Sequence, residues 1–430
     1  MAEAAQTASM MLQADALPVP PPARGVPVSF AASLKSWWSV GEKESAYAEE
    51  RLLRRLPFWR GSKPAEVDTK EPLVAYSTKV ALASDPTHYL NTLTMESTAP
   101  RDASSPPPAV MLHGYGAGLG FYFRNFDALS SWADRRKSSV HAVDWLGMGR
   151  SSRIPFSIKA KREDLEGRAK EAESFFIDSL EDWRKTQKLE TMTLIGHSLG
   201  AYFSVVYALK YPERVHRLIL LSPAGVPRDD SSIPAQELTE EQEVAGPNDG
   251  AEQPSFQKVN AMKSDQKAEK QNQTRSRKIL TYLWEEGFSP FSLARSTTVW
   301  APMLIGKYSS RRFSGLSDEE TRDMHDYILN ITLAKGSGEY CISHILAPGA
   351  HARFPLVDRI NKLKIPITFV YGDHDWMDAQ GGTASVEALR QAGNGQGRMY
   401  VVKNAGHHVY LDNPKATNDL MIKELDRDMV

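Results

Sequence analysis

The stretch Leu194–Ser204, with the letters LIGHSLGAYFS, constrains the fold more than any other part of the sequence. It places Ser198 and its neighbour His197 between Gly196 and Gly200, where a run of strand-forming residues gives way to a helical pattern. A turn this tight between a strand and a helix has room only for glycines, and it projects the serine hydroxyl above the sheet. The form G-x-S-x-G is weak evidence by itself. Its placement after a strand and before a helix predicts that Ser198 is a nucleophile.

Strands and helices alternate along most of the chain from about residue 72. Four short apolar segments, largely rich in branched residues, indicate buried parallel strands. They end at His113, Trp145, Gly196 and Ser222, and two further strands are expected at Ile365–Gly372 and Arg398–Val402. Between them, segments such as Ala169–Gln187 carry apolar residues at helical spacing. This repetition predicts an α/β fold with a doubly wound, mostly parallel sheet.

Changes in composition divide the chain into four parts. After the fourth expected strand comes a polar, charged stretch with few large apolar residues, which predicts disorder or a mobile loop. Apolar and aromatic residues then return at helical spacing, which predicts a helical cap inserted before the last two strands. The expected parts are residues 1–65 (leader and membrane-proximal helix), 66–227 (first part of the sheet domain), 228–361 (polar insertion at 228–278, cap at 279–361) and 362–430 (second part of the sheet domain).

The N-terminal part combines a leader with an aromatic and basic segment. Residues 1 to about 30 are rich in Ala and Pro and are expected to be flexible. Aromatic residues then bracket a short helix that carries arginines; they are Trp37, Trp38, Phe58 and Trp59 around Arg51, Arg54 and Arg55. Indole rings and arginines suit the headgroup region of a bilayer, which favours an interfacial anchor. A helix docked on the domain surface fits the same pattern, and both interpretations stay open.

The charge balance and the single cysteine limit the classes of function. Lys and Arg number 52 and Asp and Glu number 53, so a net charge of -1 gives no global attraction to nucleic acid. The only cysteine, Cys341, excludes an intramolecular disulfide and favours a reducing compartment. The pattern of a secretory signal is missing, and no apolar run reaches the roughly 18 residues of a membrane-spanning helix. We expect an intracellular protein that contacts membranes only peripherally and has no nucleic acid partner.

A nucleophilic serine needs a general base and a group that orients the base. His407 and His408 follow a glycine after the last expected strand, and the position in the loop favours His407 as the base, with His408 as the alternative. Asp375 and Asp378 lie on the loop after the preceding strand; Asp375 is the favoured acid, and Asp378 stays open. The chain order Ser, Asp, His is the one expected on such a sheet.

An oxyanion hole needs two backbone N–H groups aimed at the developing alkoxide. Leu199, directly after the serine, would supply one of them. Tyr115, in the glycine-rich loop after the strand that ends at His113, would supply the other. This loop lacks both the Lys-Ser/Thr pair and the spacing of a nucleotide-binding loop. The mechanism needs no metal and no organic cofactor, the sequence shows no ligand cluster for either, and none is expected.

These motifs together resemble a known family. The stretches that carry the resemblance are HGYGAGLG, DWLGMGRSS, GHSLG, WEEG with SPF, GAHARFPL and GHHVYLDNP. In them the chain is similar to the α/β-hydrolase-domain lipid enzymes. This subfamily includes the lipid-droplet co-activator of triglyceride lipase, the N-acyl-phosphatidylethanolamine lipase and the fungal mitochondrial cardiolipin-specific deacylase. The resemblance covers about Ser33 to the C-terminus apart from the polar insertion, and it implies the α/β-hydrolase fold.

The resemblance also implies a function. It suggests cleavage of fatty-acyl esters of phospholipids, such as cardiolipin or N-acyl-phosphatidylethanolamine, at a lipid droplet or the mitochondrial inner membrane. The co-activator branch has asparagine at the position of Ser198, so the serine here favours hydrolysis over a role as a non-catalytic lipase co-activator. Family members carry the acid at the position of either Asp375 or Asp378. His407 and Asp412 match the H-x-x-x-x-D pattern proposed in the family for lysophospholipid acyl transfer, and an acyl-CoA-dependent lysophospholipid acyltransferase is the alternative activity.

The cap is expected to contact the lipid. Apolar residues would form a wall over the acyl chain; they are Trp284, Phe288, Phe291, Trp300 and Met303. Basic residues of the same region are candidates for pairing with a phospholipid headgroup, although charged side chains on a cap usually face solvent; they are Arg295, Arg311, Arg312 and Arg353.

Overall fold

The computed structural model of the protein describes residues 11–13, 19–62, 70–227, 243–244, 282–284, 286–347 and 351–427. Most of the expected polar insertion at 228–278 lies outside these residues, so its disorder stays a prediction. The same holds for most of the first 18 residues of the expected leader.

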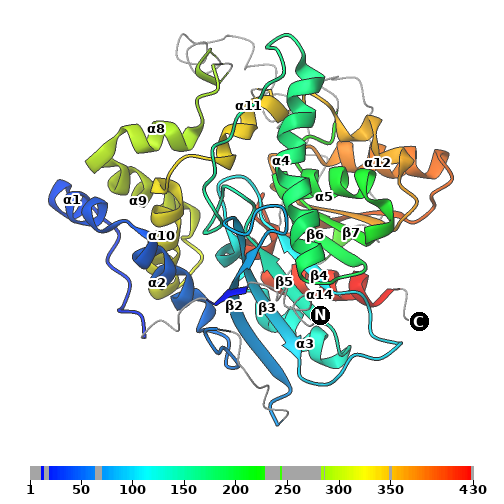
Figure 1. Ribbon diagram of the computed structural model, residues 1–430, viewed down its shortest axis with the longest axis horizontal. Coiled ribbons are helices and arrows are strands. Elements are labelled where there is room, and N and C mark those ends of the chain that lie inside the picture. Colours follow the sequence, from blue (N-terminus) through cyan, green and yellow to red (C-terminus); the bar gives the residue numbers. More distant parts are fainter. Residues whose placement is uncertain are drawn as a thin grey trace, which may run out of the picture.

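One sheet forms the centre of the molecule (Figure 1), with the strand order β1-β2-β3-β5-β4-β6-β7-β9-β10-β8. Neighbouring strands from β5 to β8 in this order are parallel, whereas β1, β2 and β3 pair in antiparallel fashion. The mostly parallel α/β sheet expected from the sequence is confirmed. The bounds are β1 (Met11–Gln13), β2 (Leu73–Ala81), β3 (Tyr89–Ser97), β4 (Ala109–Leu112), β5 (Ser139–Val143), β6 (Met192–His197), β7 (Val215–Leu221), β8 (Glu243–Val244), β9 (Ile367–Gly372) and β10 (Gly397–Val402).

Helices cover both faces of the sheet. One face carries α4 (Leu165–Thr186), α5 (Leu199–Lys210) and α12 (Ala379–Gln391), and the other carries α3 (Phe126–Arg135) and α14 (Pro414–Asp426). Along β4, Val110 and Leu112 pack into the core beneath α4, α5 and α12. Ala109 and Met111 pack into the core beneath α3 and α14. Successive side chains of a strand point to opposite faces, so a strand covered on both sides is apolar throughout.

The helical cap lies between β7 and β9 in the chain and beside the sheet in space (Figure 1). A capping box fixes the start of α10, because the Glu320 N–H donates to Ser317 Oγ and the Ser317 N–H donates to Glu320 Oε2. The cap helices are α8 (Pro290–Ser296), α9 (Ala301–Arg312), α10 (Asp318–Leu333) and α11 (Ile342–Ile345). Single 3₁₀ turns are η1 (Leu119–Tyr122), η2 (Pro212–Arg214), η4 (Thr298–Trp300), η5 (Gly338–Cys341), η6 (Leu356–Asp358) and η7 (Ile360–Lys362).

Two N-terminal helices, α1 (Phe30–Ser39) and α2 (Glu42–Leu53), pack on the cap (Figure 1). Arg51 of α2 pairs with Asp323 and Asp326 of α10, at 3.2 and 2.8 Å. Arg55 pairs with the same Asp323 at 2.6 Å. Arg51 and Arg55 therefore hold α2 on the cap, which is the docked arrangement that the sequence left open beside an interfacial anchor.

Part of the leader is also held in place. Arg51 donates a hydrogen bond to the carbonyl of Pro21 at 2.9 Å. Val26 lies so close to Gly306 of α9 that a Cβ on that glycine would come within 2.9 Å of Val26 Cγ1. Residues 19–29 therefore contact α2 and the cap, although their composition indicated a flexible leader.

The substitution Asp323→Ala tests how α2 is docked. It removes a carboxylate that is 5% exposed and shared by Arg51 and Arg55, so two guanidinium groups lose a partner. We expect the free energy of unfolding, measured by chemical denaturation, to fall by about 2–4 kcal/mol. The control Lys170→Ala breaks an exposed pair with Glu166 on helix α4 and should cost less than about 1 kcal/mol. Equal losses in the two variants would contradict the docking role.

Candidate active site

The turn between β6 and α5 holds Ser198 in a backbone conformation that L-residues rarely adopt, with φ 52° and ψ -117°. A Cβ on Gly200 would come within 2.4 Å of the carbonyl oxygens of Leu112 and His113. A Cβ on Gly196 would come within 2.7 Å of Ala201 Cα. Only glycine fits at either position, and the strain at Ser198, on the order of 1–3 kcal/mol, is borne by the packing around it.

Three side chains from different loops meet at this turn. The Ser198 hydroxyl donates to His407 Nε2 at 3.0 Å, and His407 Nδ1–H donates to Asp375 Oδ1 at 3.1 Å. This direction follows because a carboxylate only accepts, which places the proton of a neutral ring on Nδ1. Ser198 is 8% and Asp375 1% exposed, so water competes little with these bonds.

The two candidate acids on the loop after β9 have different partners. Asp375 contacts His407 and also accepts the Met377 N–H at 3.0 Å. Asp378 is the N-cap of α12 and accepts the Gln380 N–H at 2.9 Å. The geometry therefore assigns the imidazole contact to Asp375 and the helix cap to Asp378.

Asp373, on the same loop, joins it to the loop of His407. It accepts the N–H groups of Asn404 at 3.1 Å and of Ala405 at 3.0 Å. The loops that carry Asp375 and His407 are thus bonded directly to each other.

Two further histidines support the His407 loop. His197 Nε2–H donates to the backbone carbonyl of His407 at 2.9 Å. His408, the alternative base, makes no hydrogen bond to Ser198. Its ring stacks on Phe121 with centroids 5.9 Å apart. Burial lowers the pKa of both His197 and His408 well below the usual value, so both rings are neutral near pH 7.

The glycine-rich loop after β4 lies against the serine, since a Cβ on Gly114 would come within 2.9 Å of Ser198 Cβ. The His113 ring braces this loop: Nδ1–H donates to the Gly114 carbonyl at 2.8 Å, and Nε2 accepts the Trp145 N–H at 3.1 Å. Burial lowers the pKa of His113 to about 4, so the ring stays neutral and keeps this tautomer.

The two expected oxyanion donors belong to the residues that follow Ser198 and Gly114, which contact each other. Leu199 is the first residue of α5, and N–H groups in the first turn of a helix have no partner within the helix. Tyr115 follows Gly114 in the loop. Both backbone groups therefore come from the segments that meet at Ser198.

The family model described as alpha/beta hydrolase fold matches residues 107–414. The chain belongs to the α/β-hydrolase fold family. A 1-acylglycerol-3-phosphate O-acyltransferase of Arabidopsis thaliana is 36% identical over 340 residues, which cover 77% of this chain and 68% of the relative. A (lyso)-N-acylphosphatidylethanolamine lipase of Homo sapiens is 30% identical over 316 residues, which cover 72% and 77%. A 1-acylglycerol-3-phosphate O-acyltransferase of Mus musculus is 31% identical over 332 residues, which cover 75% and 78%. The resemblance to lipid-acting members of the family is confirmed.

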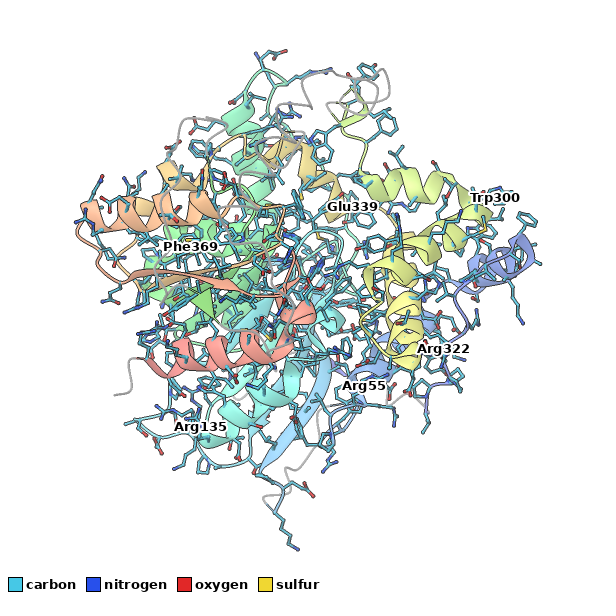
Figure 2. The ribbon with its side chains drawn as sticks, turned by 180° about the vertical axis from the view of Figure 1, so that it is seen from behind. Arg55, Arg135, Trp300, Arg322, Glu339 and Phe369 are labelled. Atoms are coloured by element: carbon cyan, nitrogen blue, oxygen red, sulfur yellow. The ribbon has the colours of Figure 1, made fainter. Side chains whose placement is uncertain are left out.

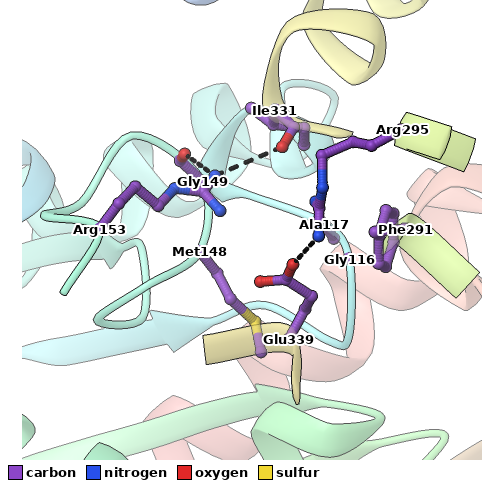
Figure 3. Close-up of a pocket in the computed structure, with 9 residues that line it drawn as sticks. All are labelled: Gly116, Ala117, Met148, Gly149, Arg153, Phe291, Arg295, Ile331 and Glu339. Carbon is purple, nitrogen blue, oxygen red and sulfur yellow. Dashed lines mark hydrogen bonds and ion pairs between the residues drawn. The ribbon is translucent and has the colours of Figure 1, made fainter. Parts of the chain in front are cut away.

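The cap of this α/β-hydrolase approaches the glycine-rich loop through Phe291 of α8. A Cβ on Gly116 would overlap the Phe291 ring, and the rings of Tyr115 and Phe291 lie 5.2 Å apart. A cavity of only about 20 Å³ lies between this loop and the cap (Figure 3). Phe288 and Trp300 are each 48% exposed and do not line this cavity, so their place in a wall over the acyl chain stays a prediction.

Two of the four arginines expected to bind a headgroup have partners within the cap. Arg295 pairs with Glu339 beside the cavity (Figure 3). Arg353 Nε donates to the carbonyl of Ser343 at 2.8 Å. Arg295 and Arg353 therefore hold cap segments together.

Asp412, the acidic end of the H-x-x-x-x-D pattern, does not contact the His407 ring. Its Oδ2 accepts the Gly406 N–H at 2.9 Å, and its Oδ1 accepts from Arg312 at 2.9 Å. Asp412 thereby fixes the turn before His407. The sequence pattern singled out Asp412 as a partner of His407 in acyl transfer. In the structure Asp412 instead holds the loop that carries His407.

Trp376 was not a site candidate from the sequence. It follows Asp375 directly, its ring lies 5.0 Å from the His407 ring, and it is 60% exposed. The sequence signal for this residue was only its position directly after Asp375.

Two other properties concern the whole described part of the chain. Within these ranges, no group of three or more His, Cys, Asp and Glu side chains could hold a metal ion. No helix there combines the length and apolar character that crossing a membrane requires. The expected absence of a cofactor stays a prediction.

A pair of matched variants distinguishes the two aspartates. Asp375→Asn leaves the loop similar in shape but favours the wrong tautomer of His407, and we expect kcat on an ester substrate to fall about 10⁴-fold. Asp378→Asn keeps an N-cap residue of similar quality and should change kcat less than about threefold. A larger loss with Asp378→Asn than with Asp375→Asn would contradict the assignment.

Proposed function

We propose that this α/β-hydrolase is a serine lipid hydrolase that cleaves fatty-acyl esters of phospholipids through Ser198, His407 and Asp375. The observation that carries the proposal is the continuous hydrogen-bonded chain from the Ser198 hydroxyl through His407 to the buried Asp375 carboxylate. A serine on a strained turn, with a base in contact and a buried acid behind it, is the arrangement that nucleophilic acyl transfer requires.

In the first half of the reaction, Ser198 Oγ forms a bond to the ester carbonyl carbon and its proton passes to His407 Nε2. Asp375 stabilises the imidazolium that results. Collapse of the tetrahedral intermediate breaks the bond to the glycerol oxygen, which takes the proton from His407. The N–H groups of Leu199 and Tyr115 stabilise the oxyanion. In the second half, water gives a proton to His407 and attacks the acyl carbon; the bond to Ser198 Oγ then breaks, Ser198 takes the proton back from His407, and the fatty acid leaves.

Relatives support a lipid substrate. The mammalian relative named (lyso)-N-acylphosphatidylethanolamine lipase favours phosphatidylethanolamine derivatives as candidates here. Cardiolipin is a further candidate from the sequence resemblance.

Acyl transfer is the second candidate, because several relatives are named 1-acylglycerol-3-phosphate O-acyltransferase. It requires only that the hydroxyl of a lysophospholipid replace water in the second half of the reaction. The alcohol oxygen attacks the acyl carbon as its proton passes to His407; the bond to Ser198 Oγ then breaks, and Ser198 takes the proton back. The same acyl-enzyme serves both outcomes.

The proposal includes peripheral contact with a lipid surface, at a lipid droplet or the mitochondrial inner membrane. Helix α1 turns an apolar face outward and buries Ser33 and Ser36 on its inner face. The α1 face adjoins the start of α9 through the rings of Phe30 and Trp300, 4.7 Å apart. The apolar platform, as we name these exposed side chains of α1 and α9, consists of Phe30, Leu34, Trp38, Trp300, Leu304 and Tyr308. Contiguous exposed apolar side chains indicate an interaction surface.

The nucleophile is tested with Ser198→Ala beside Ser222→Ala. Ser222 is also buried, also follows a strand and also has a positive φ, but it makes no hydrogen bond to His407. We expect Ser198→Ala to abolish fluorophosphonate labelling and acyl release from a panel of phospholipids, lysophospholipids and triacylglycerol. Ser222→Ala should retain both. If Ser198→Ala keeps wild-type acyl release, or if the wild type acts only by stimulating an added lipase, the hydrolase proposal fails.

The platform is tested by flotation of the protein with phospholipid vesicles. Leu34→Glu and Leu304→Glu each put a charge into the lipid contact, and each should weaken binding about fivefold or more. Leu165→Glu is the matched control, because Leu165 is 44% exposed but lies at the start of α4. Equal effects at all three leucines would contradict the platform.

A further inference from the structure

A basic groove opens beside the loops that carry the triad. It encloses about 530 Å³. Its walls are the end of α9 and the loops around His374 and Gly406, and the residues used below are Arg124, Arg311, Arg312, His374, Gly406 and Asp412. We call it the basic groove.

The arginines of the basic groove differ in whether they bind a carboxylate of the protein. Arg124 binds Glu320 through two N–H groups, at 3.2 and 2.8 Å. Arg312 binds Asp412 at 2.9 Å. Arg311 is exposed and has no hydrogen-bond or ion-pair partner within the described part of the chain. Three guanidinium groups thus face two carboxylates, which leaves one positive charge for a ligand.

Two further ionisable groups of the groove, Asp412 and His374, are already paired. Asp412 accepts from Gly406 N–H as well as from Arg312. His374 bonds to Asp373 at 2.8 Å. A ligand would therefore meet the free guanidinium of Arg311 and the unused guanidinium N–H groups of Arg124 and Arg312, which only donate. Such a set suits an anion with several acceptor oxygens.

The groove adjoins the catalytic loops. Gly406 directly precedes His407, and His374 directly precedes Asp375. An anionic group held in the groove would therefore lie next to the two loops that position the base and the acid.

Helix α9 connects the groove with the apolar platform. Leu304, Tyr308 and Arg311 follow one another at spacings of four and three residues, which places them on one face of the helix. Figure 2 shows Trp300 at the outer end of the cap, where this face begins. A lipid whose chains contact Leu304 and Tyr308 would reach the groove with its polar end, because Arg311 terminates the same face.

We infer that the basic groove binds the phosphate group of a glycerophospholipid, with Arg311 as its main contact, and so selects phosphate-bearing lipids over neutral ones. This inference rests on the proposed function, whose substrate class it narrows. Arg311 also lies in the last turn of α9, where a cation stabilises a helix. That effect predicts a change in stability but no preference between lipids.

Binding is measured on the Ser198→Ala background, so that the result does not depend on turnover. The probes are lysophosphatidic acid and monoacylglycerol with the same acyl chain. We expect Arg311→Gln to weaken binding of lysophosphatidic acid about tenfold, to leave monoacylglycerol binding within about twofold, and Arg311→Lys to restore part of the loss. Arg322→Gln is the matched control, since Arg322 is an exposed arginine of α10 outside the groove (Figure 2).

Three results with the arginine variants would overturn the inference: equal losses for both lipids, no loss with Arg311→Gln, or an equal loss with Arg322→Gln. Glycerol 3-phosphate separates the two sources of phosphate. It should bind at least about tenfold more weakly than the lipid, because it lacks the acyl chain. Equal affinity would mean a site for a free phosphate ester and would overturn the lipid assignment. Failure of the proposed function is distinct, since it appears as absent Ser198-dependent acyl release whatever the binding data show.

Discussion

The close approach of three backbone segments at Ser198 determines how this site is built. Gly200 lies against the carbonyl oxygens at the end of β4, and Gly114 lies against the Ser198 side chain. The serine therefore sits where the sheet, the helix α5 and the glycine-rich loop are closest to one another. The strained backbone at Ser198 persists because its neighbours are fully packed, and the same packing brings the two segments with the proposed oxyanion donors to the nucleophile.

Buried charge links this loop to the N-terminal helix α2. Asp144 accepts the Leu119 N–H at 2.7 Å and a hydrogen bond from Asn91 at 2.9 Å. Asn91 also donates to Glu49 of α2, and Arg150 binds Glu49 at 2.7 Å. Burial raises the pKa of Glu49 to about 7 against the pull of Arg150. The docking of α2 and the shape of the glycine-rich loop are therefore parts of one hydrogen-bonded network.

The sequence predicted what depends on local rules. The parallel strands, the tight turn at Ser198 and the position of His407 follow from strand patterning and from the steric need for glycine. The choice between Asp375 and Asp378 depends on where α12 begins; an aspartate directly before a helical stretch is a cap signal that could have separated them.

The features that the sequence did not predict depend on contacts between residues far apart in the chain. Arg55 lies 268 residues before its partner Asp323, so no local pattern shows that the α2 arginines are paired within the protein. Surface helices usually bury their apolar face and expose their polar face, and helix α1 does the opposite. Ser33 donates to the Val299 carbonyl at 2.6 Å, and the apolar side chains face outward. The antiparallel pair β2 and β3 extends the sheet at the side where alternation of strand and helix no longer applies.

The central claim is that acyl groups pass through Ser198. The most direct measurement is mass spectrometry of the protein after brief incubation with a phospholipid and acid quenching, with peptide mapping. The account predicts a fatty-acyl mass on the peptide that contains Ser198, which disappears as the substrate is consumed. Fatty acid release without any acylated Ser198 peptide, or acylation at another residue, would contradict it.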